Sequence, residues 1–265
     1  KTDTYQIYFQ GDYYHNPTLN KNEFITRNYA NGDVVQQQIK RNRRTEIGTA
    51  IAGLDWKIND QNTFSHSILF SSEKILDDGD EPFFYRDLST RRRLWQFLED
   101  ELKTTLTATN MFKHLYAKPG QVLNIAFNYT WHQEDEKYFF TDINPTYTDQ
   151  NDFKLLSDEN VFDLNVDFQK PLQMGKLESG LKTRYRFIPT NMIFHPGVHT
   201  PFDMGAGGWA NYKETIPAAY LNYLIDTKTL ELEAGLRMEY VNVQYAVDPN
   251  NKVYKTDGYE YFQPF

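Results

Sequence analysis

The sequence predicts an all-β chain folded as an antiparallel, up-and-down transmembrane β-barrel. Apolar and polar residues alternate with period two in several segments. These segments are about eleven to fourteen residues long, roughly double the usual strand of a soluble sheet. Turn-forming stretches and long polar segments alternate between them, as in membrane barrels. Since a tilted strand needs about nine to eleven residues to cross a bilayer, each segment is long enough to span one.

The alternation is clearest at residues 230–240, where Leu232 and Leu236 fall on one face and Glu233 and Arg237 on the other. The same pattern recurs at residues 123–132, 161–169 and 176–187. One face suits lipid and the other suits water.

Composition supports a single membrane-embedded unit. The 265 residues contain no linker-like stretch. A mean hydropathy of -0.69 is compatible with a barrel because only every second strand residue meets lipid. The aromatic content of 16% fits interfacial girdles, with an aromatic-rich soluble sandwich as the alternative. A net charge of -8 argues against nucleic acid as a partner.

About nine strands are predicted, joined by short turns at one end and long loops at the other. The strands are expected at residues 4–14, 45–57, 62–73, 100–116, 121–134, 160–171, 175–188, 211–226 and 229–244. The turns are expected at 59–61, 118–120, 173–175 and 226–228, and the loops at 15–44, 74–99, 135–159, 189–210 and 245–259. In bacterial barrels such turns are periplasmic and such loops extracellular.

The strand count predicts part of a larger barrel. About nine strands leave an open edge that lipid cannot satisfy, and a further strand only begins at Tyr261. All of residues 1–265 are therefore expected to belong to one barrel domain, with no plug domain in this chain.

Residues 91–116 are ambiguous, because Leu94, Phe97, Leu98 and Leu102 recur at helical spacing and a short amphipathic helix competes with strand.

Basic residues on a lipid face would cost about 2–4 kcal/mol each at the midplane, so those within strands are expected to point inward. There they would line the pore or contact a plug. The lumen-facing candidates are Lys182, Arg184, Arg186, Glu231, Glu233, Arg237 and Glu239.

Three motifs resemble the C-terminal half of TonB-dependent outer-membrane receptor barrels of the Bacteroidota type. They are ETIPAAYLNY at residues 214–223, AGLRMEY at 234–240 and the aromatic-proline stretch YFQPF at 261–265. The stretch KPGQ at 118–121 also resembles a periplasmic turn of that family. The resemblance is best over residues 100–265. It implies a gated importer in the bacterial outer membrane, with a plug domain and an energy-coupling protein as partners, and it implies no catalysis.

Other polar clusters have weaker functional interpretations. His195, His199 and Asp203 could ligate a metal, and Asp77, Asp78, Asp80 and Glu81 could hold calcium, but surface loops are the favoured interpretation and no metal is expected. The basic clusters Lys40, Arg41, Arg43 and Arg44, and Arg91–Arg93, could contact lipopolysaccharide phosphates or simply end strands at the water interface.

The sequence therefore favours the barrel wall of an outer-membrane nutrient transporter or receptor. One alternative is a barrel of the same family acting as a scaffold or plug in a secretion or surface complex. A second is a soluble carbohydrate-binding β-sandwich. Common hydrolase signatures are missing, so neither catalysis nor a cofactor is expected. Expected partners are outer-membrane lipid and lipopolysaccharide, and a surface lipoprotein is a further candidate.

Overall fold

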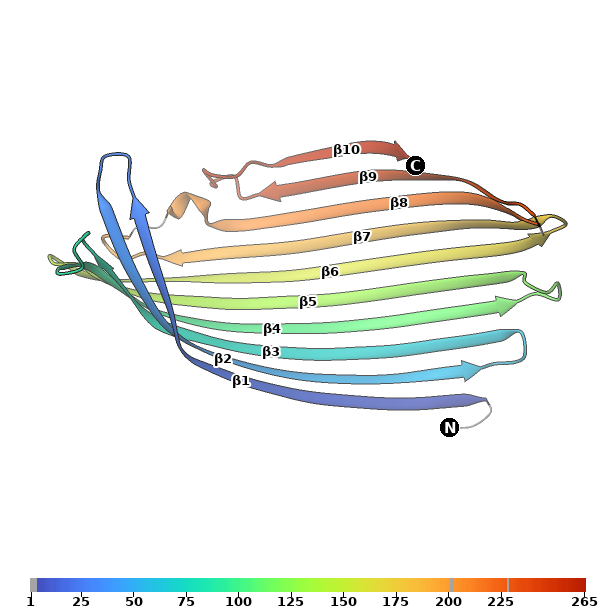
Figure 1. Cartoon of the computed structure of the whole chain (residues 1–265), viewed down its shortest axis with the longest axis horizontal. Helices are drawn as coiled ribbons and strands as arrows, with labels where there is room; N and C mark the ends of the chain where they lie inside the picture. Colours follow the sequence, from blue (N-terminus) through green and yellow to red (C-terminus); the bar gives the residue numbers. More distant parts are fainter. Residues whose placement is uncertain (1–3, 201–202, 228) are drawn as a thin grey trace.

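The computed structural model describes residues 4–200, 203–227 and 229–265 and shows one ten-stranded antiparallel sheet. Each strand pairs with the next along the chain (Figure 1). The strands are β1 Tyr5–Asn28, β2 Val34–Lys57, β3 Asn62–Phe84, β4 Arg91–Leu115, β5 Val122–Ile143, β6 Thr148–Leu172, β7 Gly175–His195, β8 Gly208–Asp226, β9 Glu231–Val247 and β10 Asp257–Pro264. A 3-10 turn, η1 Met204–Ala206, precedes β8.

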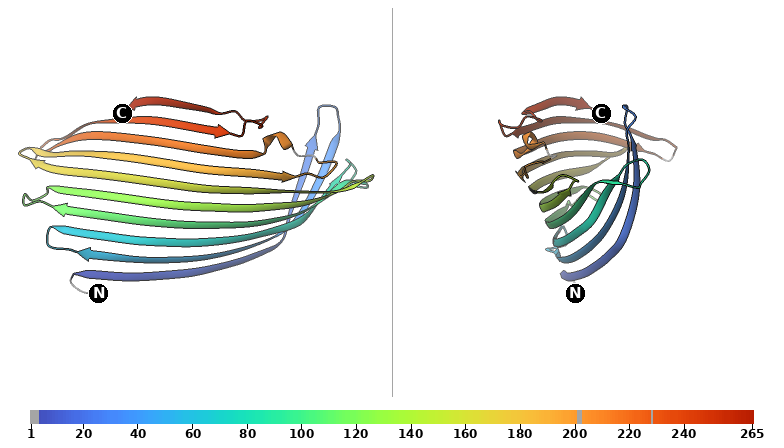
Figure 2. Two further views of the ribbon diagram at one scale, coloured as in Figure 1. Left: turned by 180° about the vertical axis from the view of Figure 1, so that it is seen from behind. Right: turned by 90° about the vertical axis from the view of Figure 1, so that its left-hand side faces the viewer.

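The sheet is a curved, open wall, with β1 and β10 as its two edges (Figure 2). The expected all-β, up-and-down antiparallel architecture is confirmed. The two packed layers of a sandwich are not formed, because the described strands share one sheet. In the described part of the chain, no helix is long and apolar enough to span a membrane.

The predicted loop boundaries are wrong, because most of the expected loop residues are strand. The expected loop 15–44 is a hairpin in which β1 runs to Asn28 and β2 starts at Val34. The expected loops 74–99 and 135–159 are likewise largely β3, β4, β5 and β6. In these stretches both faces of the sheet carry polar residues, so the period-two signal is lost while strand pairing continues.

The structure also resolves the ambiguity at residues 91–116 and moves one predicted strand boundary. Residues 91–115 form strand β4 and no helix, since Leu98 and Leu102 lie on one face of the sheet while Phe97 lies on the other. The tenth strand begins at Asp257, earlier than the expected Tyr261. Of the predicted turn 226–228, Lys228 lies outside the described residues.

Two glycines shape the short turns at the end of the wall that carries the N-terminus in Figure 1. Gly120, between β4 and β5, has a φ of 79°, and Gly175, at the start of β7, has a φ of 131°. Both values lie in the region that favours glycine. At Gly175 a side chain would also meet the carbonyl oxygen of Leu224, so only glycine fits there.

Strand register divides the side chains between two faces. We call the face that carries Arg184 the inner face and the opposite face the outer face. Arg184 is directly paired with Asp163 and Ile216, and paired residues share a face. The most buried side chains of the described chain, among them Ile75, Asp77 and Asp142, lie on the inner face. The inner face is therefore the crowded side of the curved wall.

The outer face carries an apolar belt next to the short turns. On β5 it runs from Leu123 to Trp131, which matches the span of about nine to eleven residues that a tilted strand needs to cross a bilayer. The belt continues across the sheet through exposed residues such as Leu181, Leu221 and Leu236, which are 62%, 53% and 55% exposed. Apolar side chains left this open to solvent indicate a lipid-facing surface.

Aromatic rings and then ion pairs mark the far edge of the belt. Tyr129 stacks on Phe162 with ring centroids 4.7 Å apart, and its hydroxyl donates to Asn160 at 2.9 Å. Immediately beyond, the outer face becomes charged, with Lys154 and Asp135 3.1 Å apart. We call the strand segments beyond this edge the rim. They are outside the membrane-spanning part of the wall.

A pair of arginine substitutions on β5 tests the two faces at one height. Phe127, at the centre of the belt, faces outward, and its neighbour Asn128 faces inward opposite Asp163. Phe127→Arg is expected to destabilise the protein by about 2–4 kcal/mol, because the charge enters lipid. Asn128→Arg is expected to change stability by less than about 1 kcal/mol. Unfolding of the full protein in phosphatidylcholine bilayers by urea measures both, and equal costs would contradict the assignment of faces.

Candidate functional site

The register places all seven lumen-facing candidates on the inner face. Lys182 pairs with Ala218, which in turn pairs with Glu239, and Gly180 pairs with Tyr220, which pairs with Arg237. The remaining candidates, Arg184, Arg186, Glu231 and Glu233, occupy alternate positions on the same two strands. That this face lines a pore stays a prediction.

Several of these charges are paired across the belt region. Arg184 makes a two-pronged contact with Asp163, at 2.9 and 3.2 Å, and Arg186 contacts Glu159. Arg237 contacts Glu239 at 2.8 Å. The fork-like guanidinium suits such carboxylate pairing. The inner face at this height is thus polar and largely charge-balanced.

In the rim, the inner face carries a carboxylate cluster that we define as Glu99, Glu101 and Glu136. Strands β4 and β5 position it, since Glu101 pairs directly with Glu136 and Glu99 lies two residues away on the same face. One oxygen from each of the three carboxyl groups lies within 4.8 Å of the other two. Lys103 contacts Glu101 at 2.7 Å, and the Tyr138 hydroxyl donates to Glu136.

Burial makes two carboxyl groups of the cluster, those of Glu99 and Glu101, easier to protonate. It raises the pKa of Glu99, and the neighbouring charges of Glu136 and Glu101 raise it further. Burial likewise raises the pKa of Glu101, against the opposing effect of Lys103. Each group can therefore act as a hydrogen-bond donor over a wider pH range than an exposed glutamate.

Two arginines and a buried aspartate flank the cluster. Asp77 is 1% exposed and pairs in register with Glu99. Its carboxylate lies 3.9 Å from Arg41 and 3.6 Å from Arg43, both on β2. Burial raises the pKa of Asp77 and the two arginines oppose that effect.

An aromatic ladder runs beside the cluster across β4 to β7. Tyr138 stacks on Phe153 at 4.4 Å, and Phe153 lies 5.8 Å from Phe194. On the other side Trp95 lies 6.2 Å from Phe140. The Arg93 guanidinium lies 4.5 Å from the centre of the Trp95 ring and contacts the buried carboxylate of Asp142, with Nε 2.5 Å from Oδ1. Ring faces and carboxyl groups thus meet on one surface.

This surface can bind a polar solute with an apolar face. Rings provide flat contact and carboxyl groups provide hydrogen bonds. The three carboxylates of the cluster could also supply oxygen ligands to a hard cation.

The two metal-binding candidates that the sequence suggested are not brought together in the structure. His195 contacts Asp152 at 2.7 Å, whereas the His199 ring lies against Tyr147. In the acidic stretch, Asp77 and Glu81 face inward, and Asp78 and Asp80 face outward. No single ion can contact both pairs from opposite faces of a sheet.

The basic clusters are also divided between the faces. Arg41 and Arg43 point inward toward Asp77, while Lys40 and Arg44 lie on the outer face. In the second cluster Arg92 contacts Asp33 at 2.7 Å and Arg93 contacts Asp142. Four of these basic side chains therefore contact carboxylates of the chain itself.

Sequence reasoning missed the carboxylate cluster because residues 74–99 and 135–159 were expected to be loops. The available signal was the absence of turn residues. No glycine or proline occurs between Gln121 and Ile143, which indicates one unbroken strand. On such a strand Glu136, Tyr138 and Phe140 share a face.

Comparison with known proteins gives one family. The model of the outer membrane protein beta-barrel family matches residues 114–265, which cover strands β5 to β10 and the end of β4. No curated protein matches the chain. The match agrees with the belt on the outer face and the polar inner face.

The cluster predicts a pH-dependent stability difference. Glu99 has a raised pKa in the folded protein, so its neutral form contributes stability that is fully present below the ordinary value of 4.5 and is lost as pH rises through the folded value. Glu99→Gln keeps the neutral state at every pH. The variant is expected to be more stable than wild type near pH 8 and equal to it near pH 4.

Thermal unfolding of the detergent-solubilised protein between pH 4 and pH 8 measures this difference. Asp100→Asn is the matched control, because Asp100 is on the same strand but faces outward against Lys74. Removing that charge should not stabilise the protein at high pH. If the stability of Glu99→Gln changed with pH in parallel with that of wild type, ionised Glu99 would cost no folding free energy and the prediction would be wrong.

Proposed function

The chain belongs to an outer membrane protein beta-barrel family, and from that premise we propose that it forms barrel wall of a TonB-dependent transporter or receptor that takes up a nutrient. Family membership places it in the bacterial outer membrane. The observation that carries the proposal is the inner-face surface of the rim, where the carboxylate cluster and the aromatic ladder extend the polar inner face beyond the belt. A scaffold needs no such internal surface.

The charges of this surface favour a neutral or cationic polar solute. Glu99, Glu101 and Glu136 are close together, and Lys103 contacts the cluster directly through Glu101. An anionic group placed there would meet like charge in a half-buried setting, which costs free energy. The rings of Tyr138 and Phe153 can stack on the apolar face of such a solute.

In the orientation that we propose for the wall, the rim is on the extracellular side of the membrane. The short connections, such as the one between Leu172 and Gly175, would face the periplasm, as in bacterial barrels generally. The rim surface would then meet a solute before it enters the barrel. A plug domain, an energy-coupling protein and a surface lipoprotein are the partners that this function would require or accommodate. Family membership assigns no catalytic activity, and the absence of enzymatic function stays a prediction.

Growth competition in the source bacterium tests import. A strain deleted for the gene is competed against wild type in defined media, each limited for one saccharide, one iron chelate or cobalamin. We expect a severalfold loss in at least one medium and none in rich medium. A strain lacking the energy-coupling protein should show the same loss, with no addition when the two deletions are combined.

Two neighbouring substitutions on β5 connect that phenotype to the inner face. Glu136→Gln removes a charge from the carboxylate cluster and is expected to reduce growth in the limiting medium. Asp135→Asn removes a charge at the same height on the outer face, where Asp135 contacts Lys154, and is expected to grow as wild type. Equal fitness of all strains in every medium, with loss of a surface complex on deletion, would instead support the scaffold function.

A further inference from the structure

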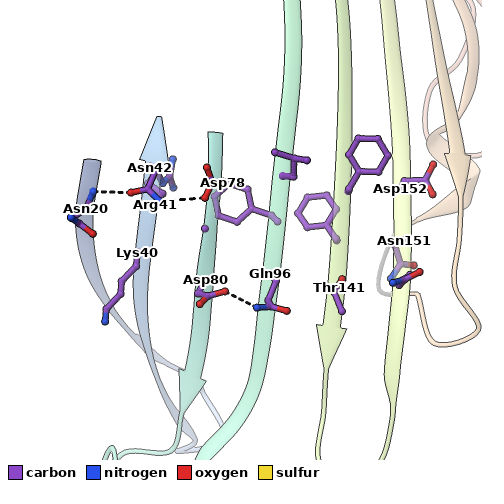
Figure 3. Close-up of a pocket in the computed structure, with 16 residues that line it drawn as sticks. Asn20, Lys40, Arg41, Asn42, Asp78, Asp80, Gln96, Thr141, Asn151 and Asp152 are labelled. Carbon is purple, nitrogen blue, oxygen red and sulfur yellow. Dashed lines mark hydrogen bonds between the residues drawn. The ribbon is translucent and has the colours of Figure 1, made fainter. Parts of the chain in front are cut away.

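A pocket of about 650 Å³ lies in the rim and is separate from the inner-face surface. Two adjacent rows of paired residues across β2 to β6 build most of its lining. One row contains Asn42, Asp78, Leu98, Phe139 and Asp152, and all five lie on the outer face. Figure 3 shows side chains of neighbouring strands lining it side by side.

The polar side chains of this pocket are held in place by one another. The Asn42 amide donates to Asp78 at 3.3 Å, and Asn42 accepts from the backbone of Asn20 at 3.0 Å. The Gln96 amide donates to Asp80 at 3.0 Å (Figure 3). These contacts orient carboxylate and amide groups without using all of their hydrogen-bonding capacity.

An apolar patch lies beside these groups. Phe139 is 45% exposed and Leu98 is 39% exposed, and they are paired neighbours on β5 and β4. A flat ring next to amides and carboxylates is suited to a ligand with hydroxyl groups on its edge and C–H groups on its face. The volume is within the usual range of about 300–1,000 Å³ for small-ligand sites.

The charge of the pocket argues against a phosphate ligand. Asp78, Asp80 and Asp152 contribute carboxylates, whereas Lys40 is the outer-face cation of the lining and Arg41 is directed inward to Asp77. A phosphate would face more like charge than opposite charge. Neutral hydroxyl groups would not.

A second hollow of about 600 Å³ lies near the β8–β10 edge of the sheet and is also lined by amide groups and an exposed ring. Its outer-face lining includes the 40% exposed Trp209 together with Asn211 and Asn242. It lies directly beyond the belt, since Asn242 follows the belt residue Tyr240 by two positions on β9. Amides and an exposed ring thus recur on the outer face of the rim, independently of the first pocket.

We propose that the β2–β6 pocket of the outer face binds saccharide. The pocket opens on the lipid side of the wall and beyond the belt. With the orientation proposed above, in which the rim is extracellular, the nearest source of saccharide is the glycan of the glycolipid that surrounds the barrel in the outer leaflet. A free oligosaccharide from the medium has the same chemistry and is the other source. The proposal does not depend on transport, because a solute on the inner face does not reach this pocket.

Binding to the full-length protein in detergent tests the proposal by calorimetry with four probes. They are the oligosaccharide released from the source strain's lipopolysaccharide by mild acid, the remaining lipid A, a mixture of maltohexaose and cellohexaose, and inorganic phosphate. We expect the released oligosaccharide to bind and phosphate to neither bind nor compete. Asp78→Ala combined with Asp80→Ala, and separately Phe139→Ala, should weaken binding at least tenfold.

Asp158→Ala is the matched control, since Asp158 also faces outward but lies outside the pocket, against Gln133. It should bind as wild type, and equal thermal stability of all variants would exclude unfolding as the cause. Binding of the hexaoses alone, with the same variant effects, would support a saccharide from the medium. Binding of lipid A or phosphate alone, no saccharide binding, or equal binding by pocket variants and wild type would overturn the proposal.

Discussion

The structure depends on hydrogen bonding between each strand and the next. In lipid no water can satisfy a free backbone group, so the ladder must be complete wherever the wall crosses the membrane. The β5–β6 pair shows the result, with an unbroken register from Val122 opposite Gln169 to Ile143 opposite Thr148. Since a one-residue slip would exchange the two faces, this register also fixes which side chains meet lipid. Strands β1 and β10 have no second neighbouring strand in the described sheet, so the requirement for a complete hydrogen-bond ladder is not met at these two edges.

The same strands serve two environments, and the chemistry of the wall follows from that. Within the belt only the inner face is polar, and its arginines are balanced by carboxylates such as Asp163. Beyond Trp131 the outer face becomes polar as well, so both sides can bind water-soluble groups. The inner side presents the crowded carboxylates Glu99 and Glu136 beside rings, and the outer side presents a pocket around Asp78. A single sheet thus separates two surfaces with different access.

The sequence predicted the part of the fold in which lipid imposes a pattern. Alternation at residues 123–131 and 232–240 located the belt, because lipid tolerates only apolar side chains on one face. The rim was missed because water meets both of its faces, and a strand such as β5 then continues to Ile143 with no period in its hydropathy. The carboxylate cluster could not be predicted for a further reason. Glu101 and Glu136 are distant in sequence, and only the β4–β5 register brings them together.

The most direct test of this account is a spin-label scan of residues 122–142 in bilayers, one cysteine at a time, which is practical because the chain has no native cysteine. Collision with oxygen reports lipid exposure, and collision with a water-soluble nickel chelate reports water exposure. The account predicts high oxygen accessibility at odd positions through Trp131, water accessibility at even positions, and loss of the oxygen signal from Gln133 onward. Oxygen accessibility that continues to residue 141, or that shows no period of two, would contradict it.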